Sequence, residues 1–211
     1  MFTGIIEEIG TVDSIKAKAN GFDIRFLAGT ILKKIRNGDS VAIDGACQTI
    51  TQIGKDSFHV QAVGETLTKS TLGGFKKGRR INLESSLTLN TPLGGHLVQG
   101  HVQGTAKILQ WMRRGDNYYL EIDIPDPLKK YCIAEGSIAI DGISLTIAHL
   151  SDRTVGISII PYTVEHTTLH TKRVGDSVNI ETDIIARYIE RYMFHSKEDG
   201  INLEKLRNWG Y

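Results

Sequence analysis

Cysteine is scarce in this sequence, with two residues among 211. Cys47 and Cys132 are too few for a disulfide framework, and neither stands at metal-ligand spacing from the seven histidines. We therefore expect no structural metal and a reducing, cytoplasmic setting.

Long apolar runs and an excess of one charge are also missing. The chain has 25 Lys and Arg against 24 Asp and Glu, a net charge of +1. No stretch of 18 apolar residues occurs, and the first residues, Met1–Glu8, are acidic where a secretory signal would be basic. We expect a globular chain with no membrane and no nucleic-acid partner.

Glycine-rich phosphate-binding loops are a third absence. No Gly-x-Gly-x-x-Gly opens a helical stretch, and the single Gly54-Lys55 pair is followed by Asp56. Nicotinamide and nucleotide cofactors therefore have no support, and we expect a protein without a cofactor.

What the chain does contain is an internal repeat. With a shift of 97 residues, Ser40–Ile50 aligns with Ser137–Ile147 without a gap, and Thr66–Leu72 aligns with Thr163–Leu169. This period is too long for a solenoid unit of about 20 to 50 residues, so each copy should close its own core. The sequence predicts a tandem duplication.

Within each copy the pattern is that of short strands. Ser40–Ile43 and Ile138–Ile140 are rich in β-branched residues and end at Asp-Gly, and Asn20-Gly21 separates two apolar runs. We expect an all-β fold of two tandem six-stranded Greek-key barrels plus a C-terminal α-helix, because a closed barrel leaves no edge strand. The predicted units are 1–95, 96–182 and 183–211.

Two short segments depart from the strand pattern, namely Glu65–Leu72 and its equivalent Tyr162–Leu169. Both are rich in threonine and suit one or two helical turns. The cluster Glu165-His166-Thr167-Thr168 within the second reads most simply as a capped turn.

A helix is predicted after Asp183, a plausible N-cap. Ile184, Ile185, Tyr188, Ile189, Tyr192 and Met193 recur there on one helical face. Two partners are open for this face: the chain's own barrel, or copies of the same helix in an oligomer.

Equivalent polar positions in the two copies are candidates for chemistry. Cys47 and Ser144 correspond, and each is either a small residue filling a tight turn or a nucleophile or donor at the rim of a pocket. Thr49 and Thr146 should share their faces, since strand side chains alternate. Asp44 and Asp141 read as turn residues before glycine.

Histidine supplies one more candidate class. His96 and His101, five residues apart, should face opposite sides of a strand, which argues against a shared metal. Either could be a general base, because the ordinary pKa of histidine is about 6.5.

Three segments carry a family resemblance: Met1–Glu7, Gly94–Val102 and Asp141–Thr146. They resemble the riboflavin synthase alpha-chain family, and the likeness runs from residue 1 to about 192. The resemblance implies two lumazine-binding barrels per chain, a C-terminal helix that gathers three chains into a homotrimer, and active sites formed between barrels of neighbouring subunits. An association with lumazine synthase is a further expectation.

The family's ligand sites can be carried over by motif. The resemblance implies a first site at Gly4, Ile5, Ile6, Cys47, Gln48, Thr49, Gln61, Ala62, Val63, Gly64, Glu65 and Thr66. It implies a second site at Gly100, His101, Val102, Ser144, Leu145, Thr146, Ile160, Pro161, Tyr162, Thr163, Val164 and Glu165. The positions placed around the reacting pair are Phe2, Ser40, His101 and Asp183, with Cys47 near the acceptor and Ser144 and His101 handling protons.

The activity implied is the dismutation of two molecules of 6,7-dimethyl-8-ribityllumazine into riboflavin and 5-amino-6-(D-ribitylamino)uracil, the final step of riboflavin biosynthesis. A four-carbon unit passes from one molecule to the other without a cofactor. The alternative is a non-catalytic lumazine or flavin carrier. Carriers that resemble this family lose the motifs of the second barrel, whereas Ser144-Leu145-Thr146 and Thr163–Thr168 persist here.

Overall fold

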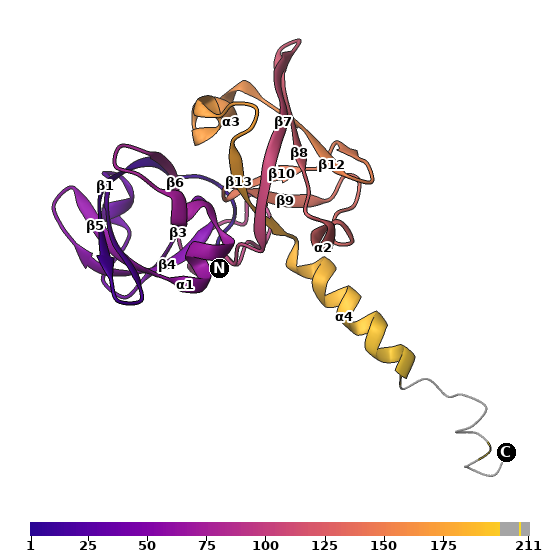
Figure 1. Ribbon diagram of the computed structural model, residues 1–211, viewed down its shortest axis with the longest axis horizontal. Helices are drawn as coiled ribbons and strands as arrows, with labels where there is room; N and C mark the ends of the chain where they lie inside the picture. The colour runs from indigo at the N-terminus through magenta and orange to yellow at the C-terminus, as the bar shows by residue number, and fades with distance from the viewer. Residues whose placement is uncertain (199–206, 208–211) are drawn as a thin grey trace.

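The computed structural model describes residues 1–198 and Arg207. It has two antiparallel β units that lie next to each other and one long helix that leaves the second unit (Figure 1). Within the described residues, no helix is long and apolar enough to cross a membrane.

The first unit is the closed six-stranded barrel that the sequence predicts, with strand order β1-β2-β5-β4-β3-β6. A 3-10 turn at Ile31–Lys33, helix α1 (Gly64–Lys69) and a 3-10 turn at Thr71–Gly74 complete it. Phe26 and Phe58 stack at 5.3 Å between ring centroids in its core. Its strands are β1 (Glu8–Lys18), β2 (Gly21–Leu27), β3 (Ser40–Ile43), β4 (Ala46–Ile53), β5 (Ser57–Val63) and β6 (Arg80–Ser85).

The second unit repeats this topology but is a curled seven-stranded sheet of order β10-β9-β13-β7-β8-β12-β11. It also holds α2 (Asp126–Lys129), α3 (Pro161–Glu165) and a 3-10 turn at Thr168–Thr171. Its strands are β7 (Gly104–Arg114), β8 (Asn117–Asp123), β9 (Ser137–Ile140), β10 (Ile143–Thr146), β11 (His149–Leu150), β12 (Thr154–Ile159) and β13 (Ser177–Thr182).

The second unit therefore differs from the predicted closed six-stranded barrel at one place. The strand equivalent to β4 is interrupted at Ile147 and Ala148, whose amides donate to Gly136 O on one side and to Gly156 O on the other, each at 2.9 Å. In the first unit the same place carries a register shift between Ile50 and Gln52, and β4 stays continuous.

The Asp-Gly pairs form the expected hairpin turns and also join the two units. Asp44 and Asp141 have φ of 43° and 45°, and the glycines after them are also left-handed, as a type I′ turn requires. Both aspartates are fully buried. The view of them as plain turn residues is thus incomplete.

Two asparagines cross between the units at these turns. Asn82 Nδ2 donates to Asp141 O at 2.9 Å, and its equivalent Asn179 Nδ2 donates to Asp44 O at 2.7 Å. Each aspartate carboxylate also accepts from the backbone amide of the asparagine in its own unit. Because these polar groups are buried and satisfied, they hold the units in one relative orientation.

The N-terminal segment and the linker between the units pair with each other. Phe2 and Val98 exchange backbone hydrogen bonds of 2.7 and 3.1 Å, and their side chains are buried against Ala42 and Ala139. The N-terminal segment around Phe2 and the linker around Val98 thus meet at the junction of the two units. We call these the crossing segments.

Helix α4 (Ile184–Glu198) begins as predicted, with Asp183 Oδ1 accepting from the Ile185 amide at 2.9 Å. It extends away from both units (Figure 1). Ile185, Tyr188 and Ile189 are 54 to 70% exposed, so their own unit does not cover this face. The part of the predicted 183–211 segment at 199–206 and 208–211 lies outside the described residues.

Candidate functional site

Cys47 and Ser144 make the same backbone contact in the two units. The Cys47 amide donates to Gly100 O, and the Ser144 amide donates to Gly4 O, both at 2.8 Å. Gly100 and Gly4 have positive φ values of 81° and 77°, which favour glycine. A Cβ added to Gly100 would lie 2.6 Å from the Cβ of Cys47, and one added to Gly4 would lie 2.6 Å from the Cβ of Ser144. The two positions are therefore structurally equivalent, as the repeat predicts.

These contacts bring the predicted site segments together in a different combination from the predicted grouping. Gly4 and Ile6 were grouped with Cys47, and Gly100 and Val102 with Ser144. In the structure, Gly4 lies against Ser144 and Ile6 packs on the core of the second unit, whereas Val102 packs on the core of the first. Each segment contacts the other unit because it crosses the junction before its own unit begins. Spacing along the chain cannot reveal such a crossing.

Two buried glutamates, missed by the sequence analysis, anchor the crossing segments. Glu84 accepts from the Thr3 and Gly4 amides at 2.6 and 3.0 Å, and its equivalent Glu181 accepts from the Gln99 and Gly100 amides at 2.6 and 2.9 Å. Burial raises the pKa of both carboxyls, and these hydrogen bonds act in the opposite direction. The repeated Asn-x-Glu motif at 82–84 and 179–181 is the sequence signal that could have identified these two glutamates.

The outer face of the first unit carries a cleft of about 1120 Å³ beside Cys47. Side chains alternate along β4, so Cys47 and Thr49 face outward while Gln48 and Ile50 are buried. His101 and Val102 from the linker, Val63 and α1 line the cleft, and Ile184, Arg187 and Tyr188 of α4 close one side. The pocket is thus assembled from both units and α4.

Charged groups surround this cleft. Glu65 pairs with Lys69 at 2.6 Å, and Lys130 forms an ion pair with Glu190 of α4. Arg187 and Arg191 also line the wall, so cations outnumber carboxylates around Cys47. Such a wall favours an uncharged or anionic ligand.

The Ser144 position has a histidine partner that the sequence analysis did not select for the site. His96 Nδ1 lies 2.7 Å from Ser144 Oγ. Burial lowers the pKa of His96, and the charge of Asp183 acts in the opposite direction. His96 is therefore neutral near pH 7 and can exchange a proton with the serine hydroxyl. The sequence does not reveal this contact, because 48 residues separate His96 from Ser144.

Several predicted site residues point away from these surfaces. Phe2 is fully buried at the junction, and Ala62, Leu145 and Val164 face the cores, so their side chains cannot contact a ligand outside the barrels. Their places follow from strand alternation and from the apolar face of α3. Gln48 is also buried, with Nε2 donating to Cys47 O at 2.5 Å.

The remaining predicted residues lie at the outer surface. Ser40 stands opposite Thr49 in the β3–β4 ladder, and Thr146 is exposed beside Ser144. Glu65 and Thr66 line the Cys47 cleft. The others on the surface or partly exposed are Ile5, Gln61, Gly64, Ile160, Pro161, Tyr162, Thr163 and Glu165.

Comparison with known proteins agrees with this duplicated arrangement. A family model described as the lumazine binding domain matches twice, at residues 3–86 and 99–183. The chain is 38% identical to the riboflavin synthase of Bacillus amyloliquefaciens, covering 96% of this chain and 94% of that protein. The chain belongs to the riboflavin synthase family. Members of this family in Bacillus subtilis (strain 168) and Schizosaccharomyces pombe are each 39% identical to it, over 94 and 90% of its length.

Solved structures share the fold. LumP complexed with riboflavin superposes with a TM-score of 0.80 at 25% identity, covering 86% of this chain and 99% of LumP. LumP complexed with 6,7-dimethyl-8-(1'-D-ribityl) lumazine gives a TM-score of 0.78 at 24% identity. The arrangement of two neighbouring β units is thus common to this chain and LumP.

Proposed function

We propose that this protein dismutates two molecules of 6,7-dimethyl-8-ribityllumazine into riboflavin and 5-amino-6-(D-ribitylamino)uracil. A four-carbon unit leaves one molecule and completes the new ring on the other. The two substrates supply every atom and electron of both products, so the reaction uses no cofactor. This makes the protein a transferase of riboflavin biosynthesis, acting at the final step.

The observation that carries the proposal is the equivalence of Cys47 and Ser144. Each faces outward at the same strand position, and each is bonded to a glycine carbonyl of a crossing segment. Two equivalent surfaces suit two molecules of one heterocycle. Holding both rings face to face would convert a bimolecular step into a local one, worth several kcal/mol or more.

Residue roles follow from the surroundings of the two positions. Cys47 and His101 border the larger cleft, where we place the acceptor ring, and a hydroxyl, thiol or water adds to it. Ser144, with neutral His96 at 2.7 Å, would remove a proton from the C7 methyl of the donor and return one during elimination. Asp183, close enough to His96 to affect its pKa, would stabilise the protonated imidazole.

The decisive experiment is incubation of the purified protein with 6,7-dimethyl-8-ribityllumazine alone. Riboflavin is followed by absorbance and the pyrimidine by chromatography. We expect equimolar formation of both without any addition. Riboflavin formed only with an added oxidant or cofactor would contradict the mechanism.

The second candidate is a non-catalytic carrier, which the structural likeness to ligand-bound LumP favours. A carrier would bind the lumazine tightly and leave it unconverted and fluorescent. The intact Ser144-Leu145-Thr146 motif and the His96 contact of the second unit favour the enzyme.

We further propose that three chains assemble through α4, with active sites between units of neighbouring subunits. The exposed Ile185, Tyr188 and Ile189 support this assembly. Residues 1–95 and 96–182 then act as the two ligand-binding units and 183–211 as the assembly segment. The free thiols of Cys47 and Cys132 fit a cytoplasmic location. Association with lumazine synthase stays a prediction.

A further inference from the structure

A single buried carboxylate holds the linker segment that borders the Cys47 cleft. The two oxygens of Glu181 accept from the Gln99 and Gly100 amides at 2.6 and 2.9 Å, and Glu181 is 3% exposed. Burial raises the pKa of Glu181, whereas the amides of Gln99, Gly100 and His101 lower it, so a third consecutive amide also acts on this carboxylate. Gly100, with a φ of 81°, allows successive N–H groups to converge on one anion.

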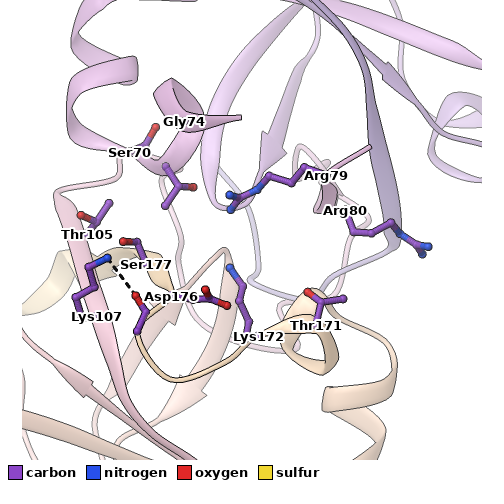
Figure 2. Close-up of a pocket in the computed structure, with 12 residues that line it drawn as sticks. Ser70, Gly74, Arg79, Arg80, Thr105, Lys107, Thr171, Lys172, Asp176 and Ser177 are labelled. Atoms are coloured by element: carbon purple, nitrogen blue, oxygen red, sulfur yellow. Dashed lines mark hydrogen bonds between the residues drawn. The ribbon is translucent and has the colours of Figure 1, made fainter. Parts of the chain in front are cut away.

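These amides, and no basic side chain of lysine or arginine, compensate the charge of Glu181. The other buried carboxylates of the junction differ, because Asp44 and Asp141 pair with Arg79 at 3.4 Å and with Lys172 at 2.5 Å. Figure 2 shows the head groups of Arg79 and Lys172 directed into the space between the units. Within the described residues, neither lysine nor arginine forms an ion pair with Glu181. Separating the linker backbone from Glu181 would therefore leave a buried charge unpaired, which is costly.

The segment that Glu181 holds carries two groups of the proposed acceptor site. Gly100 O accepts from the Cys47 amide at 2.8 Å, and the next residue, His101, lines the cleft together with Cys47. Glu181 itself is absent from the described wall of this cleft. It can therefore act on a ligand in the cleft only through the linker segment.

The equivalent carboxylate of the first unit provides a comparison. Glu84, also 3% exposed, holds the equivalent Thr3–Gly4 segment, which contacts the second unit. The residue after this segment is Ile5, at the place where the Glu181 segment has His101. The two carboxylates thus do the same structural work, but only Glu181 holds a segment that brings an imidazole to a cleft.

We propose that Glu181 is a positioning residue for the reaction, which fixes the backbone of residues 99–101 so that His101 and Cys47 keep the spacing that an acceptor ring requires. This role rests on the proposed function, and it makes a side chain of the second unit responsible for a site on the first. A shift of about 1 Å in reacting groups can lower a rate about 100-fold. Loss of the carboxylate should act mainly on kcat, because the rest of the cleft stays in place to bind the ligand.

The first test is the kinetics of Glu181→Gln, which keeps the size of the side chain but replaces one acceptor oxygen by an NH2 group. In assays of riboflavin formation from 6,7-dimethyl-8-ribityllumazine, kcat should fall at least about tenfold while KM changes less than about twofold. The control is Glu8→Gln, because Glu8 holds the Gly29 and Ile31 amides in the same way, at 2.6 and 2.8 Å, outside the cleft. It should keep the wild-type kcat and KM.

The second test is alkylation of Cys47 by iodoacetamide, mapped by mass spectrometry on the protein without substrate. Glu181→Gln should raise the Cys47 rate several-fold, because Gly100, which lies against Cys47 Cβ, is no longer held in place. Glu84→Gln loses the equivalent buried hydrogen bond and should leave the Cys47 rate unchanged. Cys132, whose pKa burial raises to about 11, is the internal reference for opening of the whole chain.

Glu181→Asp, which keeps both charged acceptors on a shorter side chain, takes the place of the glutamine variant if that variant does not fold, and its kcat should fall about tenfold. Wild-type kcat and wild-type Cys47 alkylation in a folded Glu181 variant would overturn the role. So would an equal rise of alkylation at Cys47 and Cys132, since it would show a loss of global stability alone. If the wild-type protein forms no riboflavin, the proposed function fails, and the alkylation rates by themselves decide whether Glu181 holds the Cys47 site.

Discussion

His96 Nδ1 and Ser144 Oγ lie 2.7 Å apart, and they join the linker that precedes the second unit to the edge strand β10 of that unit. The histidine is buried and its pKa is lowered by that burial. The hydrogen bond places a neutral base next to a hydroxyl that faces outward, the arrangement needed for proton transfer to a bound ring.

The first prediction concerns the pH dependence of this pair. As the pH falls through the lowered pKa of His96, the imidazole gains a proton and can no longer accept one, so kcat should fall on the acid side, below about pH 6.5. His96→Gln should lower kcat by about 100-fold or more and flatten this acid limb. The measurement is the rate of riboflavin formation from about pH 5 to 8.

His170→Gln is the matched control, because His170 is exposed and its Nδ1 contacts only the local Thr167 carbonyl within the described residues. It should keep the wild-type profile. An unchanged acid limb in His96→Gln would show that another group titrates there.

The second prediction concerns the close approach of Gly100 to Cys47. A methyl group at Gly100 would lie 2.6 Å from Cys47 Cβ and 2.8 Å from a Phe2 ring carbon, so Gly100→Ala must displace the crossing segment. The free energy of unfolding should fall by more than the 1 to 2 kcal/mol, roughly, that a left-handed alanine alone costs. Urea denaturation measures the difference.

Gly78→Ala separates the two contributions. Gly78 has a φ of +88° but nothing within 4 Å of an added Cβ, so this variant carries the backbone strain without the clash. Equal losses of unfolding free energy in Gly100→Ala and Gly78→Ala would mean that the junction adapts to a side chain at position 100.

The third prediction concerns the fully buried Asp44. Burial, with the nearby charge of Asp141, raises its pKa to about 7. Because the folded protein then holds this proton more tightly than the unfolded chain, the stability it contributes is full below about pH 4 and is lost as the pH rises through 7. Asp44→Asn keeps the acceptor for the Asn82 amide but cannot titrate.

The measurement is the free energy of unfolding of both proteins from about pH 4 to 8. Relative to wild type, the free energy of unfolding of Asp44→Asn should rise with pH, by an amount on the order of a few kcal/mol. The buried Glu84 and Glu181 titrate in both proteins and cancel in this comparison. A pH-independent difference would contradict the raised pKa.

The fourth prediction concerns assembly through α4. Ile185→Glu with Ile189→Glu places charges on the exposed apolar face and should convert the proposed trimer to monomers in sedimentation experiments. Val174→Glu, which replaces another apolar residue that is 61% exposed outside α4, should leave the assembly unchanged. A wild-type protein that sediments as a monomer would refute the assembly.

Much of this molecule could be predicted from the sequence because it rests on local rules. The Asp-Gly and Asn20-Gly21 hairpins, the helical turns at α1 and α3, and the N-cap at Asp183 all depend on neighbours along the chain. The repeat is visible when the chain is aligned with itself. The outward direction of Cys47 and Thr49 follows equally from strand alternation.

Other features exist only in the folded chain, since they join residues far apart in sequence. The exchange of Gly4 and Gly100 between units, the anchoring by Glu84 and Glu181, and the His96–Ser144 contact each span 48 residues or more. Periodicity carries no information on such distances. Two equivalent β units with equivalent polar strand positions can be read from the repeat. Which segments complete each site depends on the folded chain, because burial and hydrogen bonding at the junction select those partners.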